Sequence, residues 1–272
     1  MERINVLGRG FVGGRFCELT TNVFINQRND YIVKSGTKEV VYFISTIDNY
    51  NVHTDPYIDI ETNLITLIKT LESCKGKDIT FNFISSWFVY GNVQLPAKED
   101  SYCDPKGFYS ITKRSAEQLL ISYCETFGLN YRIIRLANVL GKSDKKVSKK
   151  KNALQYMINE IKEGRDVNLY DNGDVYRDYI HVDDVVQSIN LIIKSGNKNE
   201  IYNVGNGEKV YLGDVLKTVK QITNSPSRLI PVEPANFHTK VQTKNMVLDV
   251  SKVKDLGYVR QYTMRDILDT LL

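Results

Sequence analysis

The sequence lacks a long apolar run and any close pair of cysteines. The best apolar run, residues 40–44, has the length of a strand, whereas a membrane span needs about 18 apolar residues. The 4 cysteines are far apart, which argues against a metal site and favours free thiols in a reducing compartment. A strand-like segment begins at Arg3 and leaves no room for a signal peptide. We therefore expect a cytoplasmic protein with no membrane partner and no bound metal.

The sequence also lacks a strong excess of charge of one sign. It has 36 basic and 32 acidic residues, a net charge of +4. This excess is too weak to indicate nucleic-acid binding, and aromatic residues do not interleave with the basic run, but it suits a small anionic ligand. The hydrophobic share of 42% and the charged share of 25% are typical of a globular protein and argue against disorder, collagen and coiled coil.

Short β-rich apolar runs alternate with helical periodicity in the first half of the chain. This pattern predicts an α/β fold with a parallel sheet covered by helices on both faces. Only about 13 residues lie between Asn26 and Val40, enough for a minimal crossover but not for a helix, a further strand and another helix. We therefore expect a sheet trimmed at its edge after the second strand. The expected strands are residues 4–7, 23–26, 40–45, 79–85 and 131–136, and the expected helices are 11–20, 59–74 and 108–127.

The pattern changes after Gly141. Lys and Ser crowd residues 142–151, either as a solvated loop or as a segment that closes over substrate phosphates. We expect a dinucleotide-binding domain over residues 1–140, to which part of 175–205 returns, and a smaller mixed α/β substrate domain over 141–272. Further expected elements are a helix over 153–163, a strand over 167–170, and a helix capped by Asp183 or Asp184 that runs to Lys194.

A G-x-G-x-x-G motif lies between the first expected strand and the first expected helix. Its glycines let the backbone turn tightly and approach a pyrophosphate, whose charge is stabilised by the positive end of the helix. In this strand–turn–helix context the motif predicts a Rossmann-like, doubly wound dinucleotide-binding fold. The residues of the motif that we expect to bind the cofactor are Gly8, Arg9, Gly10, Phe11, Val12 and Gly13.

A second cofactor signal follows the second strand, where an Asp or Glu commonly binds the adenine ribose. Counting about 20 residues on from Gly8 gives Arg28. A guanidinium binds the 2′-phosphate that a carboxylate would repel, and Arg9 could contact the same phosphate. In the alternative, both arginines are solvated and Asp30 binds a plain ribose. The sequence thus favours NADP(H), with NAD(H) as the alternative.

Tyr109 and Lys113 lie four residues apart, on one face of an expected helix. A free tyrosine has a pKa near 10, and lowering it to about 7 takes roughly 4 kcal/mol. One ammonium about 4 Å away supplies about that much at an effective dielectric constant of about 20. Tyr109 is therefore a candidate general acid or base. Ser85 and Ser86 end the preceding strand, at the edge of a parallel sheet where ligands bind.

With these motifs the chain resembles, over nearly its whole length, the extended short-chain dehydrogenase/reductase family, in its epimerase/dehydratase branch acting on nucleotide sugars. The resemblance implies an NAD(P)-dependent oxidoreductase of nucleotide-sugar and polysaccharide biosynthesis that takes a nucleotide-diphosphate sugar. It also implies a homodimer formed through the Tyr-bearing helix and the helix before it. The motifs that carry the resemblance are residues 10–13, Asn63, residues 85–91, Tyr109 with Lys113, residues 135–141 and residues 177–184.

The resemblance implies catalytic roles for three residues. Ser86 would hydrogen-bond the O4 atom of the sugar, and Tyr109 would donate or accept its proton. Lys113 would hold the nicotinamide ribose and lower the pKa of the tyrosine. Asn63 matches an asparagine of the family's cofactor site.

The resemblance also implies the substrate contacts. Asn138 and Arg177 would bind the nucleotide diphosphate, a role that suits a planar guanidinium. Asn152 aligns approximately with a further substrate-site position. For Arg177 the alternative is a salt bridge to Asp178 or Asp183.

Two departures from the family narrow the chemistry. Trp87 and Phe88 occupy the positions of the Asp–Glu pair in 4,6-dehydratases, and neither side chain exchanges a proton at neutral pH. In GDP-fucose synthases a cysteine and a histidine stand where this chain has Trp87 and Asn152, so epimerisation at C3 or C5 lacks its acid and base. Of the reactions of this family, these two departures leave hydride transfer at C4 of the sugar.

We expect an NADPH-dependent reductase of a nucleotide-linked 4-keto-6-deoxyhexose. A 4-epimerase with retained NAD is the alternative that uses the same residues. An alternative of another class is a non-catalytic NAD(P)-binding sensor module, although such proteins commonly lose the tyrosine or the lysine.

Overall fold

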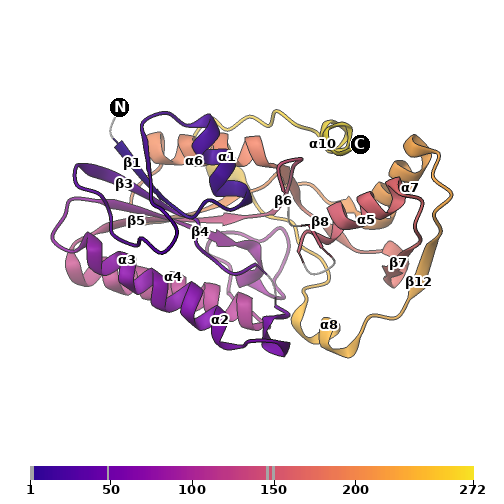
Figure 1. The fold of residues 1–272 in the computed structure, drawn as a ribbon, viewed down its shortest axis with the longest axis horizontal. Coiled ribbons are helices and arrows are strands. Elements are labelled where there is room, and N and C mark those ends of the chain that lie inside the picture. The colour runs from indigo at the N-terminus through magenta and orange to yellow at the C-terminus, as the bar shows by residue number, and fades with distance from the viewer. Residues whose placement is uncertain (1–2, 48, 145–146, 149–150) are drawn as a thin grey trace.

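The core of the protein is a six-stranded parallel sheet, seen in a computed structural model that describes residues 3–47, 49–144, 147–148 and 151–272 (Figure 1). Its strands are β1 (Arg3–Leu7), β2 (Val23–Ile25), β3 (Thr37–Tyr42), β4 (Thr80–Ser86), β5 (Asn130–Leu136) and β10 (Glu200–Val204). They lie in the order β10-β5-β4-β3-β1-β2, and every neighbouring pair is parallel.

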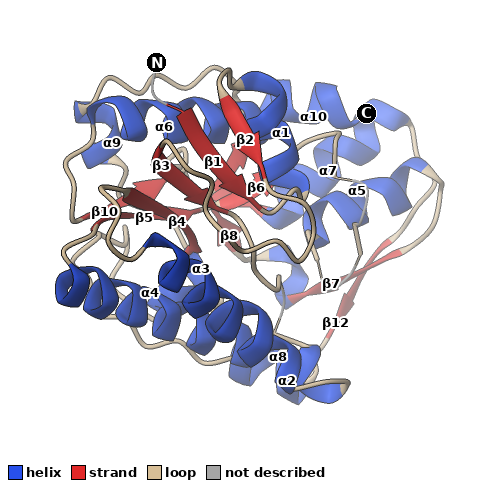
Figure 2. Ribbon diagram, turned by 60° about the vertical axis from the view of Figure 1, so that its left-hand side comes forward, coloured by secondary structure: helices blue, strands red, loops and turns tan. Residues whose placement is uncertain are grey.

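Helices cover both faces of this sheet (Figure 2). Successive strand residues point to opposite faces, so Val6 and Val41 pack on one side and Leu7 and Val40 on the other. The first face is covered by α1 (Phe11–Leu19) and α6 (Val182–Ser195), and the second by α3 (Thr66–Cys74) and α4 (Phe108–Phe127). The predicted Rossmann-like, doubly wound fold is therefore confirmed.

The predicted trimming of the sheet is confirmed as well. β2 is the edge strand, and the described residues 26–36 that connect it to β3 contain no helix and no further strand. Two buried asparagines hold this connection in place. Asn5 Nδ2 donates to Asn26 Oδ1 at 2.7 Å, Asn26 Nδ2 donates to the carbonyl of Ile32 at 2.9 Å, and Asn5 Oδ1 accepts from the amide of Lys34 at 2.7 Å. Hydrogen bonds of side-chain amides therefore hold this connection against the sheet, although the connection contains no helix.

The helix expected over 59–74 is present, and it consists of α2 (Tyr57–Ile60), a π-helical segment (Glu61–Ile65) and α3 in succession. The expected cap of the later helix was wrong. The cap of α6 is neither Asp183 nor Asp184 but His181, whose ring nitrogen accepts from the amide of Asp183 at 3.2 Å. Both aspartates lie in the first turn instead, where they favour the positive helix end.

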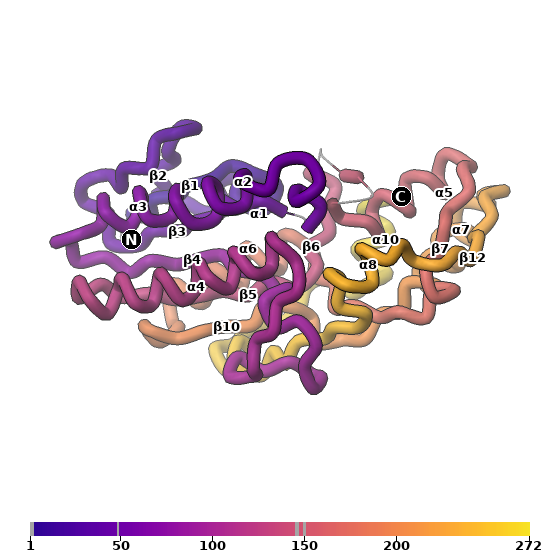
Figure 3. The backbone as a smooth tube through the Cα atoms, turned by 90° about the horizontal axis from the view of Figure 1, so that it is seen from below, coloured from indigo at the N-terminus to yellow at the C-terminus, as the bar shows by residue number. Residues whose placement is uncertain are grey.

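The remaining elements gather mainly at one end of the molecule (Figure 3). α5, α7 and α10 enclose an apolar cluster of their own. Paired strands link this region: β6 with β9 and β7 with β12 in parallel, and β8 with β11 in antiparallel. These elements are β6 (Asn138–Leu140), α5 (Ala153–Lys162), β7 (Val167–Tyr170), β8 (Tyr176–Arg177), β9 (Tyr179–His181), β11 (Val210–Tyr211), α7 (Leu212–Thr223), β12 (Leu229–Val232), α8 (Asn236–Val241), α9 (Ser251–Asp255) and α10 (Met264–Leu271).

The division into domains at residues 140 and 141 stays a prediction. Within the part described, no helix is long and apolar enough to span a membrane. Nor do the described His, Cys, Asp and Glu side chains form a group of three that could hold a metal ion.

Candidate active site

The glycine motif forms a tight turn between β1 and α1. Gly8 has a φ of +97°, and a Cβ there would lie 2.9 Å from the amide nitrogen of Ile44. A Cβ on Gly13 would lie 2.1 Å from the carbonyl oxygen of Gly8, so neither position admits a side chain. Gly10 caps α1 without any side-chain bond, and the first turn of α1 contains no acidic residue. The amides and the positive end of α1 therefore remain available for an anion, and the turn fits a pyrophosphate.

Arg9 and Arg28 are exposed, and neither has a carboxylate partner within the described part of the chain. Asp30, in contrast, is held within its own turn: Lys34 Nζ lies 2.5 Å from its carboxylate, and the amide of Ile32 donates to it at 3.1 Å. The bond from Lys34 is the main reason that the pKa of Asp30 lies below its usual range. The two guanidinium groups are thus free to bind an anion, whereas the carboxylate is engaged.

α4 and β4 bring Tyr109 and Ser86 together through Lys113. Lys113 Nζ donates to the carbonyl of Ile84 in β4 at 2.7 Å. The Tyr109 ring meets the Phe88 ring edge-on at 5.9 Å between centroids, so α4 begins at the carboxyl end of β4. From Lys113 back to Tyr109 is about 6 Å along the helix, and from Ile84 on to Ser86 is about 6.6 Å along the strand. Tyr109 and Ser86 therefore both lie at the carboxyl end of β4.

Lys113 is buried, with an exposed fraction of 2%. Burial lowers its pKa to about 7, against a smaller opposite effect of Glu117 one turn further on. Glu117 is itself neutralised by Arg135, with Nη2–Oε2 at 2.8 Å, and by Arg114 at 2.8 Å. Desolvation therefore leaves the ammonium only partly charged near pH 7, whereas its spacing from Tyr109 alone suggests a full charge.

Replacing Lys113 by methionine is expected to stabilise the protein at low pH. The pKa of Lys113 is about 7 in the folded chain and 10.5 ordinarily, so below pH 7 the folded protein carries the full penalty of a buried charge. This penalty fades as the pH rises from about 7 to 10.5. Lys113→Met should therefore raise the free energy of unfolding at pH 6 by on the order of 2 kcal/mol, and by less at pH 9.

Denaturant unfolding of both proteins at the two pH values checks this result. Lys69→Met, at an exposed position of α3, is the matched control and should leave the free energy of unfolding unchanged. A Lys113→Met protein less stable than the wild type at pH 6 would contradict the account of this charge.

Ser86 ends β4 and caps the 3-10 turn Trp87–Tyr90 that follows. Its Oγ accepts from the amide of Phe88 at 3.3 Å, which leaves the hydroxyl hydrogen for another acceptor. Trp87 stacks on Phe88 with ring centroids 3.9 Å apart. The guanidinium carbon of Arg177 lies 5.4 Å from the Trp87 ring. Trp87 and Phe88 therefore form an aromatic wall. Ser86 and Tyr109 lie at one end of this wall, and the guanidinium of Arg177 lies at the other.

Arg177 does not form the salt bridges that the sequence left as an alternative. Asp183 binds Arg15 of α1 at 2.6 and 2.9 Å, and Asp178 accepts from the backbone amides of the loop after β10. Arg177 instead donates to the carbonyls of Tyr176, at 3.0 Å, and of Thr243. Among the residues that are described, no carboxylate pairs with it. Burial lowers the pKa of Arg177, as expected for a cation that lacks a counter-ion.

Asn63 lies in the π-helical segment before α3 and is almost fully buried. Its Oδ1 accepts from the amide of Thr46 at 2.9 Å and from Ser45 Oγ at 3.1 Å. Its Nδ2 donates to Thr46 Oγ1 at 2.8 Å and to Thr112 Oγ1 at 2.9 Å. These four bonds use the whole capacity of the amide and tie the loop after β3 to α4. A direct contact of Asn63 with the cofactor stays a prediction.

Asn138 and Asn152 both lie near β6. Asn138 Nδ2 donates to the carbonyl of Asp178 at 3.0 Å, next to Arg177 in the chain. Asn152 caps α5 in the left-handed region, with a φ of 56°, and its Nδ2 donates to the carbonyl of Val139 at 3.2 Å. Their contact with a diphosphate stays a prediction. Within the Lys-rich stretch, residues 145–146 and 149–150 lie outside the described residues. The expectation that this stretch closes over substrate phosphates therefore also stays a prediction.

α8 is tied to Arg177, which donates to the carbonyl of Thr243 two residues after this helix. His238 Nδ1 lies 2.9 Å from Tyr50 Oη, and its ring is 4.7 Å from that of Tyr170. Phe237 meets Tyr50 at 5.3 Å and His53 at 4.4 Å between ring centroids. Because these partners are far apart in the chain, no local pattern in the sequence announces the contacts.

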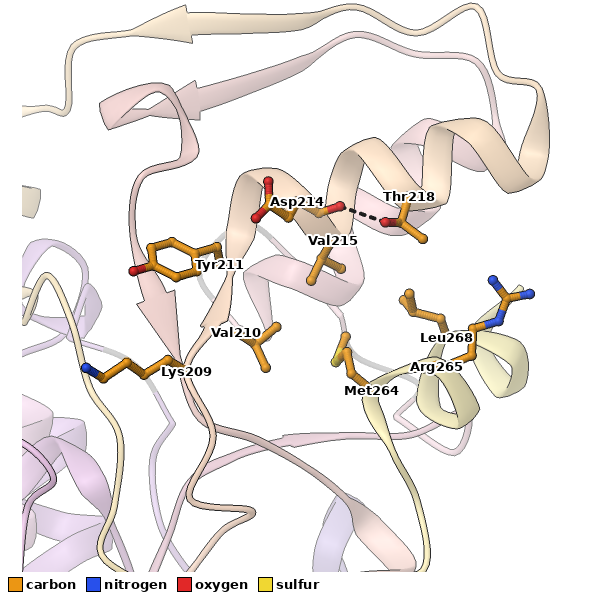
Figure 4. A pocket seen from close by; sticks show the side chains of 9 residues that line it. All are labelled: Lys209, Val210, Tyr211, Asp214, Val215, Thr218, Met264, Arg265 and Leu268. Atoms are coloured by element: carbon orange, nitrogen blue, oxygen red, sulfur yellow. Dashed lines mark hydrogen bonds between the residues drawn. The ribbon is translucent and has the colours of Figure 1, made fainter.

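A groove of about 330 Å³ lies elsewhere, between α7 and α10 (Figure 4). It contains none of the residues proposed for the site. Its lining residues are Lys209, Val210, Tyr211, Asp214, Val215, Thr218, Met264, Arg265 and Leu268.

Comparison with known proteins gives one family and several relatives. The model of the NAD dependent epimerase/dehydratase family matches residues 8–205. The chain is 28% identical over 189 residues to the GDP-6-deoxy-D-mannose reductase of Pseudomonas aeruginosa, covering 64% of this chain and 62% of that protein. It is 26% identical over 196 residues to the ADP-L-glycero-D-manno-heptose-6-epimerase of Brachyspira hyodysenteriae, covering 71% and 61%. The aligned part thus spans less than two thirds of either relative.

Solved structures share the fold. The structure of RMD from Pseudomonas aeruginosa complexed with NADPH has a TM-score of 0.85 at 21% identity and covers 100% of this chain and 98% of that one. The UDP-glucose 4-epimerase of Thermotoga maritima with UDP-glucose has a TM-score of 0.86 at 23% identity and covers 99% and 97%. With a family match over residues 8–205, and with the glycine turn, the serine of β4 and the tyrosine and lysine of α4 in place, the chain belongs to the NAD-dependent epimerase/dehydratase family.

Proposed function

We propose that the protein is an NADPH-dependent reductase that converts a nucleotide-linked 4-keto-6-deoxyhexose to its 4-hydroxy product. The observation that carries this proposal is the chemistry at the carboxyl end of β4. Ser86 ends the strand there, the next two positions hold the stacked rings of Trp87 and Phe88, and the ring of Tyr109 meets that of Phe88. Neither ring exchanges a proton at neutral pH, so this end of β4 favours proton exchange at a single oxygen over dehydration or epimerisation at C3 or C5.

The residues divide the work as follows. A bound nicotinamide supplies the hydride that C4 receives. Ser86 donates a hydrogen bond to the C4 oxygen and holds it against Tyr109, which gives that oxygen its proton. Lys113, in its charged form, favours the ionised tyrosine that results. The rings of Trp87 and Phe88 keep water away from the carbonyl.

The rest of the substrate follows the aromatic wall away from Tyr109. Arg177 is the group we assign to the diphosphate, because it is a half-buried cation without a carboxylate partner among the residues the structure describes. Asn138 and Asn152 are assigned to the same part of the substrate. Both have an Nδ2 bonded to a backbone carbonyl, which fixes the orientation of the amide.

For the cofactor we propose that the turn from Gly8 to Gly13 binds the pyrophosphate and that Arg9 and Arg28 bind the 2′-phosphate of NADPH. Charge-assisted bonds of this kind contribute about 1.5–3 kcal/mol each. Arg28→Ala should therefore raise the KM for NADPH by roughly 10- to 100-fold and leave that for NADH nearly unchanged.

Steady-state kinetics with both nucleotides checks this prediction. Arg265→Ala, at an exposed arginine of α10 that pairs with Asp269, is the control and should alter neither KM. An equal change of both KM values in Arg28→Ala would overturn the assignment.

The test of the proposed function is the oxidation of NADPH with a panel of 4-keto nucleotide sugars, the product's stereochemistry being read by NMR. One equivalent of NADPH should be consumed for each 4-hydroxy sugar formed. Protein that purifies with tightly bound NAD⁺ and interconverts 4-hydroxy nucleotide sugars without consuming NADPH would instead be a 4-epimerase, which the same three side chains can serve.

We also propose a homodimer formed through α4 and the helical segment over residues 57–74, which runs from α2 to α3. Apolar side chains are exposed along both: Ile58, Ile60, Ile65, Ile68, Phe108, Ile111 and Leu119. A second copy of the chain would remove this surface from water. Light scattering should then give about twice the chain mass of 31.2 kDa.

A further inference from the structure

The buried face of α4 carries charged side chains beyond Lys113. One helical turn further on is Glu117, and Arg135 of β5 binds both of its carboxylate oxygens, with Nε–Oε1 at 3.0 Å and Nη2–Oε2 at 2.8 Å. All three side chains are buried. α4 lies along β4 and β5 (Figure 1). The ammonium assigned to catalysis is therefore followed in the core by a carboxylate and a guanidinium.

We propose that Glu117 is a positioning residue for the reaction: its carboxylate keeps a proton on Lys113, and Arg135 limits how strongly it does so. This inference rests on the proposed function, in which the charge of Lys113 favours the ionised form of Tyr109. It adds to that function an ion pair that acts only through Lys113 and sets the pH range in which the ammonium is charged.

The described groups in direct contact with Lys113 are uncharged. Its Nζ donates to the carbonyl of Ile84 at 2.7 Å and lies 4.0 Å from the centroid of the Phe83 ring. Both contacts are attractive, but neither supplies a counter-charge. Burial lowers the pKa of Lys113 to about 7, and the charge of Glu117 acts in the opposite direction. Without that carboxylate, we expect desolvation to leave the amine mostly neutral at pH 7.

The spacing lets Glu117 act on Lys113 through space. Side chains four residues apart on a helix have Cβ atoms about 6 Å apart. At an effective dielectric constant of about 20, opposite charges at that distance shift a titration by roughly 2 pH units. The hydrogen bonds of the carboxylate go to Arg135 and to Arg114, whose Nη1 lies 2.8 Å from Oε2. These bonds fix the carboxylate, while Lys113 keeps its own bond to β4.

The positive charge of Arg135 opposes the effect of Glu117 on Lys113. The other groups against this guanidinium are the ring of Tyr90, at 4.7 Å, and the carbonyl of Glu99, at 3.1 Å, and neither carries a charge. Removal of the Glu117 charge leaves positive charge near the ammonium, whereas removal of the Arg135 charge leaves the carboxylate less compensated. The two changes should therefore shift the titration of Lys113 in opposite directions. A purely structural pair would lose stability in both variants without shifting this titration.

The test follows the ammonium itself by NMR. Protein whose lysines carry ¹³C at the ε carbon is titrated from pH 5 to pH 10, and Lys113→Met identifies the resonance of Lys113 by its loss. The wild-type midpoint should lie at about 7. In Glu117→Gln it should fall by about 1–2 pH units, and in Arg135→Met it should rise. Glu125→Gln, at an exposed position two turns further along α4, is the matched control and should leave the midpoint unchanged.

A double variant keeps the test decisive where a single variant does not fold. Glu117→Gln and Arg135→Met each leave one buried charge without its partner, whereas the two together leave neither. Because Glu117 is only one turn from Lys113, the loss of its charge should outweigh the loss of the Arg135 charge. The midpoint of the double variant should therefore lie below that of the wild type and above that of Glu117→Gln.

The rate of NADPH oxidation should show the same order. Since a charged Lys113 favours the ionised Tyr109 that remains after proton transfer, kcat should fall as the pH rises through the midpoint of Lys113. This fall should begin at a lower pH in Glu117→Gln than in the wild type. The comparison is between variants and not between pH values alone, because burial also raises the pKa of Asp178 to about 7.

Failure of the inference and failure of the proposed function are distinguishable. If Lys113 titrates in Glu117→Gln and in the double variant at the same pH as in the wild type, the ion pair is structural only and the inference is overturned. If the midpoints shift as expected but no 4-keto nucleotide sugar is reduced, the ion pair does set the charge of Lys113, and the proposed reaction is what is wrong.

Discussion

Replacing Tyr109 by phenylalanine is expected to lower kcat by a factor on the order of 10³, with the KM for the sugar and the Kd for NADPH nearly unchanged. The substitution removes only the hydroxyl. The ring, with an exposed fraction of 8%, keeps its edge-on contact with Phe88 and its place in the first turn of α4. Because the lost group is the one assigned to protonate the C4 oxygen, the effect should fall on the chemical step. Steady-state NADPH oxidation measures it.

Tyr123→Phe is the matched control for this variant. Tyr123 lies on the same helix, but its hydroxyl bonds Glu72 at 2.5 Å at the surface. Its kcat should equal that of the wild type. A Tyr109→Phe protein as active as this control would remove the proposed acid from the mechanism and favour a dinucleotide-binding module without catalysis.

The second large effect is expected on stability, at the buried ion pair of Arg135 and Glu117. These side chains have exposed fractions of 1% and 0%, and two bonds of 3.0 and 2.8 Å join them. Arg135→Met removes the cation and leaves a carboxylate in the core, partly compensated by Arg114. We expect the free energy of unfolding to fall by about 3–5 kcal/mol.

The pH dependence of this loss has a definite sign. In the wild type the bonds from Arg135 hold the pKa of Glu117 below its usual range despite burial, so the pair stabilises the fold at neutral pH and less in acid. In Arg135→Met the carboxyl can be protonated as the pH falls, so the loss should shrink toward pH 4.

Denaturant unfolding measures the loss, and the double variant Arg135→Met with Glu117→Leu provides the control. It removes both charges and should recover most of the stability, since apolar residues of similar volume often replace a buried pair without loss. If the free energy of unfolding of Arg135→Met lies within about 1 kcal/mol of that of the wild type, the buried ion pair does not stabilise the fold as expected.

The parts of the fold that the sequence predicts well are those set by local pattern. The glycine turn needs only a strand, three glycines and a helix in succession, and Gly8 and Gly13 leave no room for a side chain. The bounds of α4 follow from periodicity and from Gly128, a left-handed cap at its end. The trimmed edge of the sheet follows from the small number of residues between β2 and β3, which is too small for a further strand with its helices.

What the sequence does not predict depends on contacts between distant residues. The amides of Asn5 and Asn26 hold the edge of the sheet, and Asn63 braces α4, through bonds that exist only after folding. The π-helical segment around Asn63 inserts an extra residue into the turn, which apolar periodicity does not show.

The charge of Lys113 is a similar case. Its spacing from Tyr109 is visible in the sequence, but the burial that lowers its pKa to about 7 is not. In the motif over residues 177–184 only Arg177 was expected to contact the substrate, and Asp178, His181 and Asp184 do bind backbone amides of the fold. Of that motif, Arg177 alone is assigned to a ligand.

The most direct measurement is a single-turnover reduction with NADPH that carries deuterium at the transferable position, followed by NMR of the sugar. If Tyr109 and Ser86 hold a C4 carbonyl at the end of β4, the deuterium appears on C4 of the 4-hydroxy product. Deuterium on another carbon, or a 4-hydroxy product formed without any label, would contradict the account.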